Sequence, residues 1–67
     1  MPMSIEKILE EAKKMEIGDR KKFVCDHVPT TKELQHLAGQ IGKHHKITPV
    51  VNWTGETNII VNLVKPR

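Results

Sequence analysis

The side chains best suited to chemistry in this chain are the lysines and histidines of Lys43-His44-His45-Lys46. Two ammonium groups and two imidazoles in consecutive positions can contact phosphate oxygens as charges and as hydrogen-bond donors. Lys32, the run Arg20-Lys21-Lys22, and Lys65 or Arg67 are placed to extend such a surface. The alternative is a solvated loop whose lysines favour the C-terminal end of a helix.

Trp53 is the second candidate binding group. It stands beside the turn-forming segment Thr54-Gly55-Glu56-Thr57. An exposed indole in that place can stack on a nucleobase. The alternative is that Trp53 covers one end of a small core.

The third group comprises the sulfur and imidazole side chains. Zinc binds cysteine and histidine, but a Cys-x-His pair, a lone histidine and two adjacent histidines match no closed ligand spacing. The sequence also has no paired-carboxylate site, no glycine-rich phosphate loop and no nucleophile motif. We therefore expect no metal, no cofactor and no enzymatic activity. The residues in question are Cys25, His27, His36, His44 and His45.

Two helices are predicted to position these groups. Ser4 can cap a first helix over residues 4–16. Thr30 and Glu33 form the capping-box pattern at the start of a second helix, over residues 30–41, and Gly42 is suited to end it. The apolar residues that recur at helical spacing are Ile5, Ile8, Leu9, Ala12 and Met15 in the first helix and Leu34, Leu37, Ala38 and Ile41 in the second.

Three short strands complete the pattern, at residues 23–28, 46–53 and 58–64. Cys25 alternates with Phe23 on one strand face, so we expect it to be a small core residue. The element order α-β-α-β-β predicts a single α+β domain, residues 1–67, with two helices on one face of a three-stranded sheet. The opposite face would then carry apolar side chains that favour self-association. These side chains are Val24, Val28, Ile60 and Val64.

Composition narrows the class of protein. The net charge of +3 over 67 residues is compatible with an anionic partner. The single Cys25 excludes an internal disulfide, and the first residues lead directly into charged ones without a signal peptide. No apolar run approaches the roughly 20 residues that a membrane span needs. We therefore expect a cytoplasmic protein that does not enter membranes.

The second helix and its exit also show a family resemblance. The pattern Ala38-x-x-x-Gly42-x-x-His45, followed by a β-hairpin, resembles the Arg-x-x-x-His domain family. Aligned in this way, the arginine and histidine that define the family fall on Thr31 and Gln35. The resemblance implies two helices against a three-stranded sheet and binding of single-stranded DNA or RNA, with His45 as the carried-over residue.

Two functions follow as hypotheses. The first is a small nucleic-acid-binding module, with a single-stranded ligand favoured. Its contacting residues would be Lys32, Lys43, His44, His45, Lys46 and Trp53. The second is a protein-interaction module, a small regulator or inhibitor. It would use the open sheet face or the edge strand near Pro49, and it would form a homodimer if that face binds a second copy.

Overall fold

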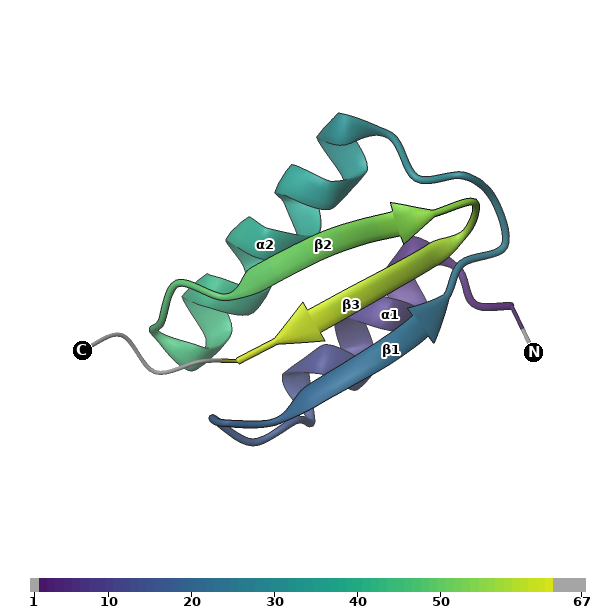
Figure 1. The fold of residues 1–67 in the computed structure, drawn as a ribbon. Coiled ribbons are helices and arrows are strands. Elements are labelled where there is room, and N and C mark those ends of the chain that lie inside the picture. The colour runs from purple at the N-terminus through teal and green to yellow at the C-terminus, as the bar shows by residue number, and fades with distance from the viewer. Residues whose placement is uncertain (1, 64–67) are drawn as a thin grey trace.

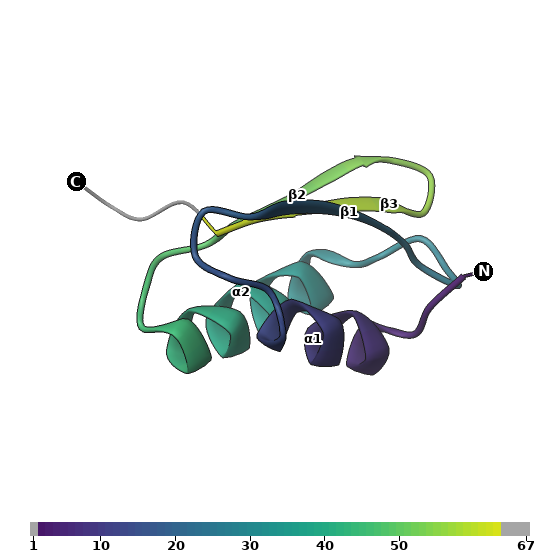
Figure 2. The ribbon, with the colours of Figure 1, turned by 90° about the horizontal axis from the view of Figure 1, so that it is seen from below.

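The computed structural model describes residues 2–63 and has the predicted order α-β-α-β-β. Figure 1 shows the three strands side by side, and Figure 2 shows both helices beneath one face of the sheet. Val64, Lys65 and Arg67, which the sequence analysis included, lie outside the described residues. The elements are α1 (Ile5–Lys13), β1 (Arg20–Val24), α2 (Thr31–His45), β2 (Val50–Gly55) and β3 (Asn58–Asn62).

The N-terminal ends of both helices follow the local cap signals. The Ser4 hydroxyl accepts a hydrogen bond from the Lys7 N–H at 3.1 Å. The Thr30 hydroxyl accepts from the Glu33 N–H at 3.2 Å, and a Glu33 carboxylate oxygen accepts from the Thr30 N–H at 2.9 Å. These bonds satisfy N–H groups that have no partner within the helix. The predicted capping box is confirmed.

The predicted end of α2 was wrong. The helix runs through Gly42 to His45, and Lys46 takes the left-handed conformation that ends it, at φ 59° and ψ 40°. Gly42 has a packing role instead, because a Cβ there would lie 2.8 Å from the Ile47 carbonyl oxygen and 3.1 Å from Pro49 Cδ. The glycine therefore lets the chain turn back closely over the last turn of the helix.

The helix α1 is shorter than predicted, since it ends at Lys13 rather than at residue 16. The chain continues in a tight turn, in which Lys14 N–H donates to Glu11 O and Met15 N–H donates to Ala12 O, both at 3.1 Å. Met15 still reaches the core, with 9% of its surface exposed, whereas Ile17 is half exposed. The apolar stripe therefore continues through the turn that follows the end of the helix.

The sheet is antiparallel with strand order β1-β3-β2. In its register Phe23 lies opposite Ile59, and Val51 lies opposite Val61. The strand β1 begins three residues earlier than predicted and contains Arg20, Lys21 and Lys22. An edge strand with one solvent-facing side tolerates such charges. The central strand β3 carries the apolar pattern, with Ile59 and Val61 fully buried.

One hydrophobic core lies between the sheet and the two helices. Among the described residues its buried members are Ile8, Ala12, Met15, Phe23, Cys25, Leu37, Ile41, Ile59, Val61 and Leu63. Cys25 is a buried core residue, as predicted. Within residues 2–63, neither helix is long and apolar enough to cross a membrane.

The opposite sheet face is open and mostly polar. The register places Val50, Ile60 and Val24 on it as a diagonal across the three strands. Val28, which was predicted to lie on this face, follows the end of β1 and is 56% exposed. The other side chains that alternation directs to this face are Arg20, Lys22, Asn52, Thr54, Asn58 and Asn62.

Candidate functional site

A shallow, open groove of about 180 Å³ lies between the C-terminal parts of α1 and α2. It is lined by Lys13 of α1 and by Gln40, Lys43 and His44 of α2. The three residues of α2 stand at positions i, i+3 and i+4, which places them on one side of the helix. Two ammonium groups, one amide and one imidazole line the groove, and no carboxylate does.

His45 does not line this groove. Its Nε2 atom lies 3.0 Å from the Ala12 carbonyl oxygen, so the ring donates Nε2–H to the end of α1. The His44 ring stands edge-on to it, with the ring centroids 4.8 Å apart. His45 thus links the last turns of the two helices, and it positions Lys13 beside Lys43 and His44.

The remaining predicted contact residues lie in different places. Lys46 is exposed and forms the cap directly after the last turn of α2. Lys32 lies at the other end of the same helix, eleven positions before Lys43, or about 16 Å along the axis. Trp53 is 50% exposed near the hairpin turn, where its Nε1–H donates to the Glu56 carbonyl oxygen at 2.7 Å. The structure therefore brings Lys43 and His44 together in the groove, whereas Lys46 follows them along the chain without lining it, and Lys32 and Trp53 lie elsewhere.

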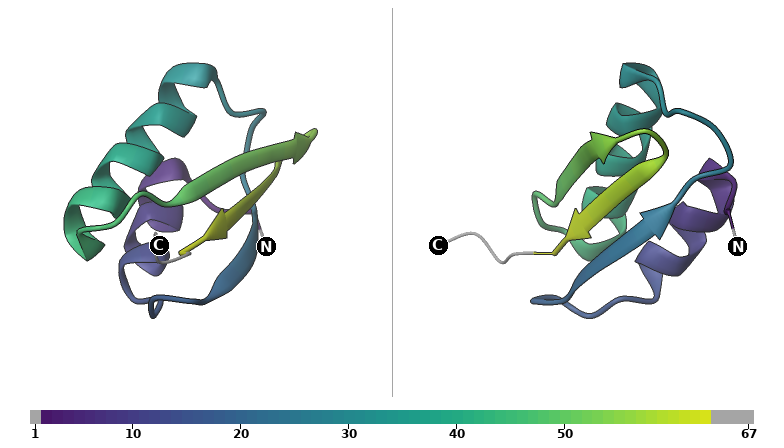
Figure 3. Two further views of the ribbon diagram at one scale, coloured as in Figure 1. Left: turned by 60° about the vertical axis from the view of Figure 1, so that its left-hand side comes forward. Right: turned by 45° about the vertical axis from the view of Figure 1, so that its right-hand side comes forward.

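Both helices run in the same general direction, so their C-terminal ends lie at one end of the molecule together with the start of β1 (Figure 1). The start of α2 and the hairpin turn lie at the other end (Figure 3). Cations in the last turn of a helix stabilise its partial negative charge. Within residues 2–63, Lys7 and Lys14 pair with Glu11, whereas Lys13 and Lys43 have no ion pair.

Sequence reasoning missed two of the four groove residues. Gln40 carried a usable signal, because it shares a helix face with Lys43 and His44 once α2 is extended past Gly42. Lys13 carried none, because it reaches the groove only through the contact between Ala12 and His45, which are 33 positions apart.

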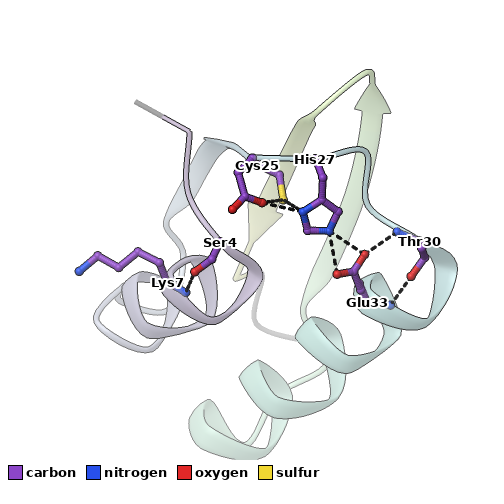
Figure 4. Close-up of polar contacts among 7 residues, drawn as sticks. Ser4, Lys7, Cys25, His27, Thr30 and Glu33 are labelled. Carbon is purple, nitrogen blue, oxygen red and sulfur yellow. Dashed lines mark hydrogen bonds and ion pairs between the residues drawn. The ribbon is translucent and has the colours of Figure 1, made fainter.

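A second polar cluster lies at the start of α2 and the end of β1 (Figure 4). His27 Nδ1 lies 2.6 Å from Asp26 Oδ1, and His27 Nε2 lies 2.8 Å and 3.0 Å from the two Glu33 oxygens. The Cys25 Sγ atom lies 3.7 Å from both Asp26 Oδ1 and His27 Nδ1. One imidazole therefore stands between two carboxylates with a thiol beside it.

The cluster shifts the acid–base behaviour of its members. The hydrogen bonds that the His27 ring donates to the carboxylates of Asp26 and then Glu33 raise the pKa of His27 above its ordinary value. The hydrogen bond with His27 lowers the pKa of Asp26. The Thr30 backbone N–H and then His27 lower the pKa of Glu33. These directions favour an imidazolium ring that donates from both nitrogens.

The spacing of Cys25, His27 and Glu33 also matches a nucleophile, a base and an orienting carboxylate. However, Cys25 is only 1% exposed, and Asp26 occupies the nitrogen that faces the thiol. A substrate carbonyl has no access to the sulfur in this arrangement. The cluster is therefore a poor site for nucleophilic catalysis.

No family model matches this chain, and no curated protein or solved structure matches it either. The resemblance to the Arg-x-x-x-His family through Ala38, Gly42 and His45 therefore stays a prediction.

Proposed function

We propose that this protein is a small nucleic-acid-binding module that contacts phosphates at the groove between α1 and α2. The observation that supports the proposal is the lining of that groove, in which Lys13, Lys43, His44 and Gln40 all offer hydrogen-bond donors. Lys46 caps the same helix, directly after its last turn. The groove is open to solvent, so an extended polyanion has access to it.

The chemistry favours phosphate over a carboxylate-bearing small molecule. The groove is shallow and has no enclosed apolar floor, which small-molecule sites usually need. Phosphate contacts require only exposed cations and donors in register, and each contact releases counterions. The expected signature is therefore binding that weakens steeply with salt and depends little on base sequence.

The test is fluorescence anisotropy of labelled single-stranded and double-stranded oligonucleotides, titrated with the untagged chain at several salt concentrations. We expect Lys43→Ala and Lys13→Ala each to weaken binding and to reduce the salt slope by about 0.7 on single strands or about 0.9 on duplex DNA. The matched control is Lys32→Ala, which removes the same charge from the other end of α2.

Two results would contradict the proposal. The first is a lack of binding to either kind of strand at low salt. The second is an equal effect of Lys32→Ala and Lys43→Ala, which would show that net charge alone, and not the groove, determines binding.

Trp53 provides a separate measurement of base stacking, because it is the only tryptophan of the chain. If a single strand stacks on the half-exposed indole, Trp53 fluorescence falls on titration with an oligothymidine, and Trp53→Leu weakens binding. If the oligonucleotide binds without quenching, the interface consists of phosphate contacts at the groove alone. A duplex ligand would give the second result, because its bases remain stacked on each other.

The open sheet face supports a second candidate function, self-association. Its diagonal of Val50, Ile60 and Val24 is the observation that favours it. However, two copies meeting face to face would bring together Arg20 and Lys22 of both, and no described side chain on this face is acidic. Like charges in such contact are destabilising, so this candidate ranks second. It predicts a dimer in sedimentation equilibrium that Ile60→Lys converts to monomer, and a wild-type monomer at high concentration excludes it.

A further inference from the structure

We propose that Cys25, Asp26 and His27 form a three-ligand site for a divalent transition metal of the zinc class. Their ligand atoms Sγ, Oδ1 and Nδ1 all lie within 4.8 Å of one another. The spacing of cysteines and histidines along the sequence predicted no such site. In the structure the side chains of three consecutive residues converge, and Asp26, which is neither a cysteine nor a histidine, supplies the third ligand atom.

The distances fit tetrahedral coordination with one small adjustment. Zinc bound at its usual distances holds a sulfur about 3.6 Å from a nitrogen or oxygen ligand, and a nitrogen about 3.3 Å from an oxygen ligand. The sulfur lies 3.7 Å from each of the other two ligand atoms. Only Nδ1 and Oδ1, hydrogen-bonded at 2.6 Å, have to separate. Both belong to exposed side chains that can rotate.

The backbone that carries the three ligands is held from two sides. The Met3 N–H donates to Val24 O at 2.8 Å, and the Asp26 N–H donates to Met3 O at 2.9 Å. From the other side the Cys25 N–H donates to Thr57 O at 2.7 Å. These bonds fix the chain as it leaves β1, so three neighbouring residues can point ligand atoms toward one place.

Glu33 gives the independent reason to consider a metal. It accepts a hydrogen bond from His27 Nε2, which leaves Nδ1 as the nitrogen that faces the sulfur (Figure 4). A carboxylate on the far nitrogen of a ligating histidine is the arrangement that fixes its tautomer and orientation in metal sites. The Thr30 N–H in turn holds the Glu33 carboxylate, at 2.9 Å. The start of α2 thereby aims the imidazole.

The ligand set determines the kind of metal and the openness of the site. One thiolate, one imidazole and one carboxylate suit Zn²⁺ or Co²⁺ and not Ca²⁺ or Mg²⁺, which prefer oxygen ligands only. Cys25 is the inner ligand, at 1% exposure, whereas Asp26 and His27 are exposed. The fourth position therefore faces solvent and takes water. Binding releases the Sγ proton, and the Nδ1 proton where the ring carries one, to solvent.

The test is titration of the untagged, reduced and metal-free chain with Co²⁺, followed by displacement with Zn²⁺. We expect one equivalent to bind with a thiolate-to-cobalt charge-transfer band and with the intense visible bands of tetrahedral Co²⁺. Zn²⁺ should abolish both signals. Asp26→Asn and His27→Gln change exposed side chains and should remove tight binding without unfolding the chain, while Cys25→Ala should remove the charge-transfer band.

Two further variants separate this site from adventitious histidine binding. Glu33→Gln keeps a side chain that a capping box accepts, and it should weaken Co²⁺ binding by about 10- to 100-fold. His44→Gln removes an exposed histidine from the groove between α1 and α2 and should leave Co²⁺ binding unchanged. The proposal is overturned if no charge-transfer band forms, if binding survives in Asp26→Asn and His27→Gln, or if His44→Gln removes it.

Discussion

At its N-terminal end, α2 carries Thr30 and Glu33, whose polar groups bond to the helix backbone and to His27. At its C-terminal end, the same helix carries Lys43 and His44, which line a groove open to solvent. Thr30 and Glu33 stabilise the fold through partners within the protein, whereas Lys43 and His44 offer hydrogen-bond donors to an external ligand. A helix of 15 residues can thus serve folding at one end and binding at the other.

Among the tests of this comparison, substitution of the two glycines of α2, Gly42 and Gly39, is expected to change the free energy of unfolding most. A Cβ on Gly42 would clash with the Ile47 carbonyl oxygen at 2.8 Å, so we expect Gly42→Ala to lower the free energy of unfolding by about 1 to 3 kcal/mol. Gly39 has nothing within 4 Å of its Cβ position, so Gly39→Ala should raise it by about 1 kcal/mol. Urea denaturation measures both. Stabilisation by both variants would contradict the close return of the chain over the last turn.

The capping box gives the next largest effect. Thr30→Ala removes the hydroxyl that accepts from the Glu33 N–H, and we expect it to cost about 1 kcal/mol of stability. Thr31→Ala is the control, because Thr31 is the first helical residue and makes no cap bond. Thermal and urea unfolding of the two variants provide the comparison. Equal losses would mean that the start of α2 does not depend on its cap.

Lys46 separates folding from binding at the C-terminal end. Its left-handed conformation, at φ 59°, suits glycine better than lysine. We therefore expect Lys46→Gly to stabilise the fold by up to about 1 kcal/mol while it weakens oligonucleotide binding. Urea unfolding and anisotropy on the same sample measure the two effects. If the fold is stabilised and binding is unchanged, Lys46 lies outside the interface.

The smallest effect is the pH dependence of the His27 cluster, measured in EDTA. The pKa of His27 is raised in the folded protein. Its contribution to the free energy of unfolding is therefore fully present below the ordinary histidine pKa of about 6.5, and it is lost as the pH rises through the raised pKa. The lowered pKa values of Asp26 and Glu33 keep their contributions present above about pH 4, and these are lost as the pH falls through the lowered values.

His27→Gln should therefore lower the stability more at about pH 5.5 than at about pH 9. The measurement is urea unfolding at the two values, with His36→Gln as the control at an exposed position of α2. An equal loss of stability at both pH values would show that the hydrogen bonds to Asp26 and Glu33 do not stabilise the protonated His27 ring.

The fold was predictable to the level of element order and of the buried face. Leu37 and Ile41 are fully buried, as their helical spacing indicates, and so are Ile59 and Val61 in alternation. The errors lie at element ends. The first strand was predicted at residues 23–28 because these residue types favour strands, but pairing with β3 places it at Arg20–Val24. Edge pairing tolerates charged residues, and composition alone does not show which residues will pair.

The candidate sites were predictable only in part. Lys43 and His44 stand out as a local run, and the groove contains both. Lys13 joins them through tertiary contact, and Lys32 is removed from them by the length of one helix. The cluster of Cys25, Asp26 and His27 was hidden because alternation along an extended strand sends neighbouring side chains to opposite faces. The strand ends at Val24, so that rule no longer holds for them.

By itself, the amino-acid sequence determined where each helix begins and which of its sides is buried. Cap bonds join residues three positions apart, and apolar burial follows a short period, so both are local properties. Only the tertiary structure decided where α2 ends, which lysines share a groove and which ligand atoms meet beside Cys25. Each of these depends on contacts between separate segments, such as Gly42 with Pro49 or Ala12 with His45, whose geometry no local pattern encodes.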